Sequence, residues 1–310
     1  MPDLTPSSAA RLGRAFTAQS DLVPLYLLRF DRENTRRAYR RDIGAFFGSE
    51  VVTLEMAAAV TFADVNESLR ALDRAGKSPA TQRRSLASLR GFFGWLVALG
   101  FLDLNPADRH LVRKVPKPSG GLVTVLTRDQ ARRLLAAVDL DRETGPRDHA
   151  LVSVLLHCVL RRSEASAMNV GDVRQTGPHT VLHIHRAKGG ADQVVNVPAA
   201  TARTLAAFVE SQGYGSGPVW RSFSTNASSG RRLSGSSIYK IVRTLGERAG
   251  IPDRVGAHTL RHTGCTLAIE GGASLQQVQH HARHKSVETT MRYVHQRDRL
   301  ANNAADFIDL

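Results

Sequence analysis

Residues 258–263 read His258-Thr259-Leu260-Arg261-His262-Thr263 and come directly after Gly256-Ala257. The glycine followed by this pattern predicts the start of a helix. Positions i and i+3 share one helix face, so we expect His258 and Arg261 to point the same way. Both lie in the first turns, where unpaired backbone N–H groups and the helix dipole attract an anion. Taken alone, this stretch fits a structural role, with a capping histidine and a surface arginine, as well as it fits a functional site.

Three further stretches carry residues of the same kind. An apolar segment runs into Leu160-Arg161-Arg162-Ser163-Glu164, and Lys188 stands in a predicted turn between strands. Near the C-terminal end the chain reads His284-Lys285-Ser286-Val287-Glu288-Thr289-Thr290-Met291-Arg292-Tyr293-Val294-His295. Each stretch alone has an ordinary explanation, such as an ion pair, a solvated lysine or an amphipathic tyrosine. The ordered set is far more specific than its members.

This ordered set resembles the catalytic signature of the tyrosine recombinases, the phage integrase family. Residues 160–164 are similar to the family's L-R-[IV]-S-E, residues 258–263 to its H-x-L-R-H-[ST], and residues 284–295 to its H-x-S-x-x-T-T-x-x-Y-x-H. Residues 35–106 also resemble the helical core-binding domain of that family. The resemblance implies a site-specific DNA recombinase that cuts and rejoins strands through a covalent 3′-phosphotyrosyl intermediate. It implies no cofactor and no metal ion.

The resemblance assigns the nucleophile and the phosphate clamp. Tyr293 is expected to attack the phosphate, and Arg161 and Arg261 to hold its non-bridging oxygens. Guanidinium groups suit this task because they bind the extra negative charge of the transition state more strongly than the ground state. Glu164 is expected to hold Arg161 in place without touching DNA.

Two further groups are expected to transfer protons and a third to bind the phosphate, because a tyrosine hydroxyl with a pKa of about 10 is mostly neutral at pH 7 and has to lose its proton. By resemblance, Lys188 protonates the departing 5′-oxygen. His258 assists proton transfer at the tyrosine, and His284 donates a hydrogen bond to the phosphate.

The chain departs from the family pattern at four positions, one of which is Ala282, where the family usually has leucine. Val159 and Arg283 stand where the family usually has glycine, and Arg162 stands where it usually has isoleucine or valine. None of these changes removes a catalytic side chain. We expect a backbone cost beside His284, since Arg283 does not adopt a glycine turn freely.

Composition favours a folded protein with a polyanionic partner. The chain has 310 residues, 42% of them hydrophobic and 23% charged, which excludes a disordered or collagen-like chain. Its 42 Lys+Arg against 28 Asp+Glu give a net charge of +14, which favours a polyanionic partner, either nucleic acid or an acidic membrane surface. The family resemblance implies that this partner is double-stranded DNA. The longest apolar stretches, residues 91–102 and 150–160, are shorter than the roughly 20 residues that a bilayer requires. With no secretory signal either, we expect no membrane association and a cytoplasmic, nucleoid-associated location.

The sequence pattern predicts a mainly α (α+β) protein. We expect a flexible leader over 1–19, a helical core-binding domain over 20–105, a basic linker over 106–121 and a catalytic domain over 122–310. Ser78 as a cap, Pro79 in the first turn and Gly100 at the end mark the clearest helix. A helix is also expected from Pro146 to Arg161. Residues 180–185 and 193–197 predict two antiparallel strands joined by the turn that holds Lys188.

Further predictions concern DNA contacts, metal and assembly. The candidate DNA-binding cations are Arg36, Arg40, Arg83, Arg84, Arg90, Lys114 and Lys117. Zinc at His280, His281 and His284 is disfavoured, because adjacent histidines on a helix face different ways and no second ligand pair has finger spacing. Cys158 and Cys265 are expected to be buried, reduced thiols.

The family resemblance implies a homotetramer on paired DNA sites, and a related recombinase or an accessory DNA-bending protein stays open as a further partner. Two other functions also stay open. One is a type IB-like topoisomerase, and the other is a non-catalytic DNA-binding protein on the same fold.

Overall fold

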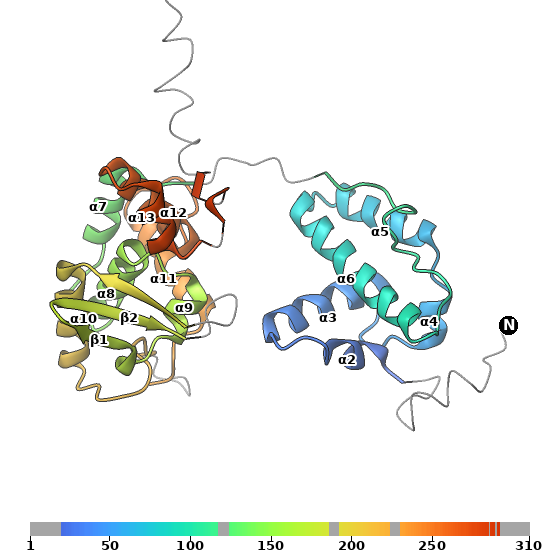
Figure 1. The fold of residues 1–310 in the computed structure, drawn as a ribbon, viewed down its shortest axis with the longest axis horizontal. Coiled ribbons are helices and arrows are strands. Elements are labelled where there is room, and N and C mark those ends of the chain that lie inside the picture. The colour runs from blue at the N-terminus through green and yellow to red at the C-terminus, as the bar shows by residue number, and fades with distance from the viewer. Residues whose placement is uncertain are drawn as a thin grey trace, which may run out of the picture. The chain divides into compact units, whose positions relative to one another are not determined.

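The computed structural model describes residues 20–116, 124–185, 192–223, 230–284, 286–288 and 290–291. The chain divides into two compact units, Met1–Gly121 and Leu122–Leu310, which Figure 1 shows as two bodies. The predicted leader and residues 117–121 of the predicted linker lie outside the described residues. Within the described ranges, every helix is too short or too polar to cross a bilayer.

The first unit is built from helices that begin at recognisable local signals. Its helices are α2 (Leu22–Leu27), α3 (Glu33–Phe47), α4 (Leu54–Ala58), α5 (Phe62–Arg74) and α6 (Pro79–Ala98). The Ser78 hydroxyl accepts the N–H of Thr81 at the start of α6, and Pro79 occupies the first turn, as predicted. Thr61 and Asp64 form a capping box at the start of α5.

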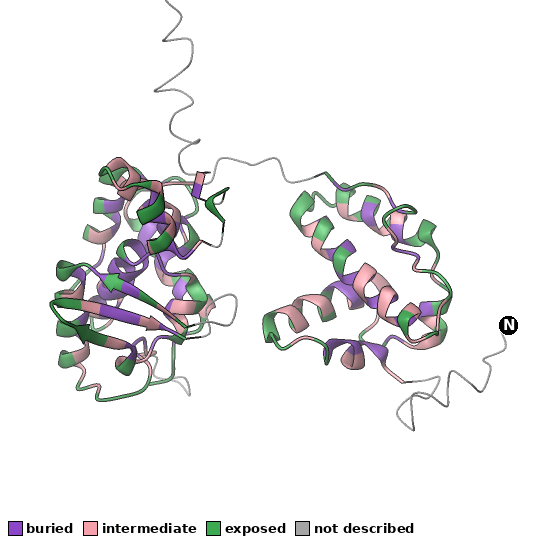
Figure 2. Ribbon diagram, viewed as in Figure 1, coloured by how far each residue is buried: buried purple, intermediate pink, exposed green. Residues whose placement is uncertain are grey.

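Aromatic side chains fill the core of this unit. Phe92 and Phe93 on α6 are fully buried, and Tyr26 of α2 packs edge-on against Phe92. Phe46 and Phe47 of α3 contact the same pair of rings. These contacts join α2, α3 and α6 around one core, and Figure 2 shows the buried residues of this unit where its helices face one another.

The second unit combines helices with a small sheet. Its elements are α7 (Arg128–Ala136), α8 (Gly145–His157), α9 (Arg162–Ala167), a 3₁₀ turn η2 (Val170–Asp172), β1 (Val173–Thr176), β2 (His179–Ile184), β3 (Gln193–Val197), α10 (Ala199–Ser211), α11 (Gly235–Arg248), α12 (Ala257–Glu270) and α13 (Leu275–Ala282). Helix α8 runs through the core, and its residues from Ala150 to Leu156 are all buried (Figure 2). The fold class is therefore mainly helical with a small sheet, as predicted.

The three strands form one antiparallel sheet in the order β1-β2-β3. Leu182 lies opposite Val173 on one side and Val195 on the other, which fixes the register of the inner strand. The sequence predicted β2 and β3 but missed β1. This strand is missed because its residues after Val173 are exposed, so it lacks the alternation of a half-buried strand.

The helix predicted from Pro146 to Arg161 was too long. Helix α8 ends at His157, and the chain reverses at Val159, whose φ of +44° is left-handed. The apolar pattern hides this end because Cys158, Val159 and Leu160 are buried, as they would be in a longer helix. As a result, Arg161 stands at the start of α9 instead of the end of α8.

Candidate active site

Arg161 and Glu164 form a local pair at the start of α9. The Glu164 carboxylate accepts the backbone N–H of Arg161 at 2.8 Å through Oε2. Its Oε1 accepts Nη1 of the same arginine at 2.6 Å. The Glu164 side chain is almost buried, whereas the Arg161 side chain keeps about a quarter of its surface exposed. Glu164 therefore contacts Arg161 at both its backbone and its side chain, and the side-chain contact is the ion pair that their spacing allows.

Arg261 lies in the second turn of α12 and is buried. Its Nη1 donates to the carbonyl of Val159, and its Nη2 donates to the carbonyl of Ala282. The two carbonyls belong to the turns that lead to Arg161 and to His284. One guanidinium thus ties together three stretches that are far apart in the sequence.

His284 follows the end of α13. Helix α13 ends where Arg283 adopts a left-handed conformation with φ of +55°. The backbone N–H of His284 donates to the carbonyl of Gln279, and its Nδ1 lies 3.0 Å from the Thr290 hydroxyl. The expected backbone cost at Arg283 is therefore present as a positive φ in a residue other than glycine.

Partial desolvation and neighbouring guanidiniums lower the pKa of two histidines of this site, His258 and His284. Burial, followed by the charges of Arg261 and Arg161, lowers the pKa of His258. The same causes, with Arg283 added, lower the pKa of His284 to about 4. The pKa of Arg261 falls to about 10 through burial and then through the charge of Arg161, so it remains a cation at pH 7. Two neutral imidazoles thus lie within the field of two guanidiniums.

The structure brings five of the predicted site residues into one network of contacts and charges, namely Arg161, Glu164, His258, Arg261 and His284. Tyr293 and Lys188 lie outside the described residues. The nearest described residues on either side of Lys188 are His185 and Asp192, which bond to each other at 3.1 Å.

Sequence reasoning missed Arg283 as a member of the site. Its Nη2 donates to Oε2 of Glu164 at 2.7 Å, and its side chain is buried. The available signal was an arginine directly before the candidate site residue His284, at a position where the phage integrase family usually has glycine.

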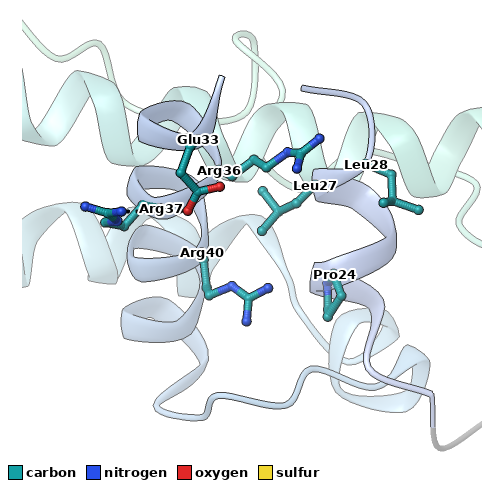
Figure 3. A pocket seen from close by; sticks show the side chains of 7 residues that line it. All are labelled: Pro24, Leu27, Leu28, Glu33, Arg36, Arg37 and Arg40. Atoms are coloured by element: carbon teal, nitrogen blue, oxygen red, sulfur yellow. Dashed lines mark ion pairs between the residues drawn. The ribbon is translucent and has the colours of Figure 1, made fainter. Parts of the chain in front are cut away.

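The predicted DNA-contacting cations of the first unit differ in their surroundings. Arg36 and Arg40 extend from α3 toward α2 over a pocket that Pro24 and Leu27 also line (Figure 3). Of the other predicted cations, Arg83 and Lys114 are exposed, Arg84 is paired with Asp42 at 2.7 Å, Arg90 donates to the carbonyl of Ala107, and Lys117 lies outside the described residues.

Metal ligands and thiols give no second site in the described ranges. These ranges contain no cluster of three or more histidine, cysteine, aspartate or glutamate side chains able to hold a metal ion. Cys158 and Cys265 are both buried thiols that take part in no disulfide, as expected from their apolar surroundings. Burial raises the pKa of the Cys158 thiol to about 12, so it stays protonated.

Comparison with known proteins gives one consistent family. The phage integrase family matches residues 124–299, and the N-terminal SAM-like domain of phage integrases matches residues 25–100. The tyrosine recombinase XerD of Bifidobacterium longum is 34% identical over 274 residues, which cover 84% of this chain and 86% of the relative. The tyrosine recombinase XerC of Pelobacter propionicus is 31% identical over 268 residues, 84% of each chain.

Solved structures share the fold. A lambda integrase dimer bound to a COC′ core site has a TM-score of 0.68 and 18% identity, and the match covers 90% of this chain and 77% of that one. The XerH site-specific recombinase bound to a palindromic difH substrate has a TM-score of 0.65 and 16% identity, with 94% and 97% of the two chains covered.

Fold, site and relatives define a DNA recombinase, an enzyme that cuts and rejoins DNA strands. The chain belongs to the phage integrase family, among the tyrosine recombinases.

Proposed function

We propose that this recombinase acts at a specific DNA site through a covalent 3′-phosphotyrosyl intermediate on Tyr293. The Tyr293 hydroxyl attacks the scissile phosphorus, the bond from phosphorus to the 5′-oxygen breaks, and that strand leaves with a 5′-hydroxyl. The protein–DNA bond keeps the energy of the phosphodiester. A 5′-hydroxyl from another strand then attacks the same phosphorus and releases the tyrosine, so the exchange consumes no ATP.

Arg161 and Arg261 neutralise the non-bridging oxygens in this proposal. The phosphate gains negative charge as the tyrosine oxygen arrives, and fixed guanidiniums stabilise that charge without reorganising. Each makes two hydrogen bonds to the protein through its η nitrogens, and the proposal assigns remaining N–H donors to the phosphate. Loss of one clamp should slow cleavage by about 10²–10³, as for a lost oxyanion donor.

The histidines and Lys188 handle protons in this proposal. A neutral His258 is able to accept the tyrosine proton, and the lowered pKa keeps it neutral at pH 7. When Nδ1 of His284 accepts a hydrogen bond from the Thr290 hydroxyl, the neutral ring carries its proton on Nε2. From Nε2 it donates a hydrogen bond to the phosphate. Lys188 delivers the proton to the departing 5′-oxygen.

The observation that carries the proposal is the network that joins Arg161, Arg261 and His284 from α9, α12 and the end of α13. The net charge of +14 supports a DNA partner. We further propose the homotetramer on paired DNA sites that the family resemblance implies, with an additional recombinase or DNA-bending protein as an optional partner. Since the substrate is DNA, we propose that the protein acts in the cytoplasm at the nucleoid.

The test is covalent trapping on nicked duplexes taken from the genomic neighbourhood of the gene. Incubation of the wild type with its target duplex should give an adduct that resists SDS. Tyr293→Phe should bind the same duplex and give no adduct, whereas an adduct that persists in this variant contradicts the nucleophile assignment. Relaxation of a supercoiled plasmid without a recombination site would favour a topoisomerase instead. DNA binding without any adduct would favour a non-catalytic protein.

A further inference from the structure

Arg283 has an unusual backbone and an unusual burial for an arginine. Its φ of +55° is left-handed, and among the described residues other than glycine only Val159 shares a positive φ. A left-handed conformation costs an ordinary side chain free energy that glycine does not lose. The Arg283 side chain is nevertheless only 4% exposed, although it ends in a charge. A residue held in this way must be fixed by its contacts.

The contacts of Arg283 all lead to the candidate active site or to the helix that ends before it. Nη2 donates to Oε2 of Glu164 at 2.7 Å, and Nη1 donates to the carbonyl of His281 at 3.1 Å. The carbonyl of Arg283 lies 3.5 Å from Nη2 of Arg161. Arg283 therefore reaches Arg161 by two routes, through its own backbone and through the shared carboxylate of Glu164.

The Glu164 carboxylate consequently accepts hydrogen bonds from three donors. They are the backbone N–H of Arg161, the Arg161 guanidinium and the Arg283 guanidinium. Burial alone would raise the pKa of this carboxyl, but the charge of Arg283 and the donors from Arg161 lower it below its usual value. A carboxylate paired with a single arginine cancels that arginine's charge. With the second arginine present, the three groups together keep one positive charge.

We propose that Arg283 is a positioning residue for the phosphate clamp. It offsets the charge of Glu164, so that Arg161 keeps its attraction for the scissile phosphate. It also fastens the turn before His284 to α9, which fixes the spacing between Arg161 and His284. This inference rests on the proposed function, since it concerns the rate of strand cleavage.

Substitutions at position 283 separate this role from a purely structural one. Glycine fits the left-handed backbone best, and asparagine tolerates it, but both lack the charge. Lysine keeps the charge and loses the planar fork that binds a carboxylate through fixed donors. A contact role predicts the activity order Arg, then Lys, then Asn and Gly. A role limited to backbone fit predicts the reverse, with glycine at least as active as arginine.

The experiment measures single-turnover adduct formation on the nicked duplex that the wild-type protein cleaves. R283G and R283N should lose about tenfold or more in the cleavage rate, the cost typical of a group that orients a ligand-binding residue. R283K should fall between them and the wild type. The dissociation constant for the same duplex should stay within about twofold in all variants, because the lost interaction acts mainly on the transition state. R203A, at an exposed arginine on α10, is the matched control and should cleave at the wild-type rate.

A second test of the charge offset replaces Glu164, the partner of Arg283, with the uncharged glutamine. In an E164Q background no carboxylate charge has to be offset, so adding R283G should slow cleavage much less than it does in the wild type. Equal effects of R283G in both backgrounds would contradict the offset of charge. Thermal unfolding of each variant checks that it is folded, and R283N and R283K keep the test valid if R283G does not fold.

Failure of this inference differs from failure of the proposed function. If the wild type gives the adduct and R283G gives it equally fast, Arg283 has no positioning role and the recombinase assignment stands. If the wild type gives no adduct on any duplex, the proposed function fails, and the inference falls with it.

Discussion

The guanidinium of Arg261 donates a hydrogen bond to the backbone carbonyl of Val159, 102 residues earlier in the chain. Val159 is the left-handed residue at which the chain turns from α8 toward Arg161. The other η nitrogen of Arg261 holds the carbonyl of Ala282, directly before the left-handed Arg283. Arg261 therefore supports the backbone of both turns that present the candidate active-site side chains, besides its proposed part in binding phosphate.

Arg261→Gln should lower stability as well as activity. The variant leaves two buried carbonyls without their charged donor, and we expect a loss of about 1–3 kcal/mol in the free energy of unfolding. Urea unfolding followed by circular dichroism measures this loss.

Arg161→Gln is the control for Arg261→Gln. Its side chain is partly exposed, and Glu164 keeps its contact with Arg283, so it should lose activity with a smaller loss of stability. Equal unfolding free energies for Arg261→Gln and the wild type would contradict the supporting role of Arg261.

Gly264 should be irreplaceable where α12 passes the end of α8. A Cβ at this position would lie 2.2 Å from the carbonyl oxygen of Leu156 and 2.6 Å from a Val159 methyl carbon. Gly264→Ala should therefore destabilise the protein by about 1–3 kcal/mol through overpacking. Gly171→Ala is the matched control, because an added Cβ there meets nothing within 4 Å. Urea unfolding of the two variants should show a loss for the first only.

Acidification should destabilise the second unit between about pH 6.5 and pH 4. Burial first, and then neighbouring charges, lower the pKa of His262 and of His284 to about 4. In the unfolded chain both titrate near 6.5, so below that pH the unfolded state binds more protons than the folded state. The stability is thus complete above about pH 6.5 and falls as the pH drops toward 4. His185 acts in the opposite direction, because Asp192 and Asp172 raise its pKa.

Urea unfolding at pH 7.5, 6 and 5 measures this pH dependence. His262→Asn should flatten this pH dependence, since one of the two half-buried histidines no longer titrates. A variant as sensitive to pH as the wild type would show that His262 does not titrate in this way.

Arg40 and Arg84 should differ in what they contribute to the first unit. Arg84 makes two hydrogen bonds with the buried carboxylate of Asp42, at 2.7 and 2.9 Å. Arg84→Ala should cost about 1–3 kcal/mol of unfolding free energy, because it removes the bidentate partner of a buried charge. Arg40 is exposed beside the pocket in Figure 3, so Arg40→Ala should leave stability unchanged.

The salt dependence of DNA binding tests whether Arg40 contacts DNA. If Arg40 contacts a phosphate, Arg40→Ala should reduce the slope of log K against log salt concentration by about one. An unchanged slope for Arg40→Ala would remove this residue from the DNA-contacting set.

The two cysteines should be unreactive in the folded protein. Both are buried, and the pKa of Cys158 is raised to about 12, so the thiolate that reacts with a disulfide reagent is almost absent. Titration with such a reagent should detect no thiol in buffer and two in denaturant. Fast labelling in buffer would indicate that the core around α8 opens readily.

The sequence by itself determined the features that depend on near neighbours. The helix start at Ser78 was predictable because a cap bonds to the backbone three residues further on. An ion pair between Glu164 and Arg161 was predictable because the two residues are three positions apart. The order of arginine, lysine, histidine and tyrosine motifs identified the family without any structure.

Only the tertiary structure decided the features that depend on partners far along the chain. The end of α8 at His157 was invisible in the sequence, since residues 158–160 are as buried as those of the helix itself. The strand β1 forms because β2 pairs with it, not because its own pattern is apolar. In the sequence, Arg283 was only a departure from glycine with a backbone cost. Its hydrogen bond to Glu164, 119 residues earlier in the chain, is seen only in the structure. Local sequence patterns specify hydrogen bonds within one helical turn. A buried charge has to be paired, and its partner can lie far along the chain, so the tertiary fold decides which residue it is.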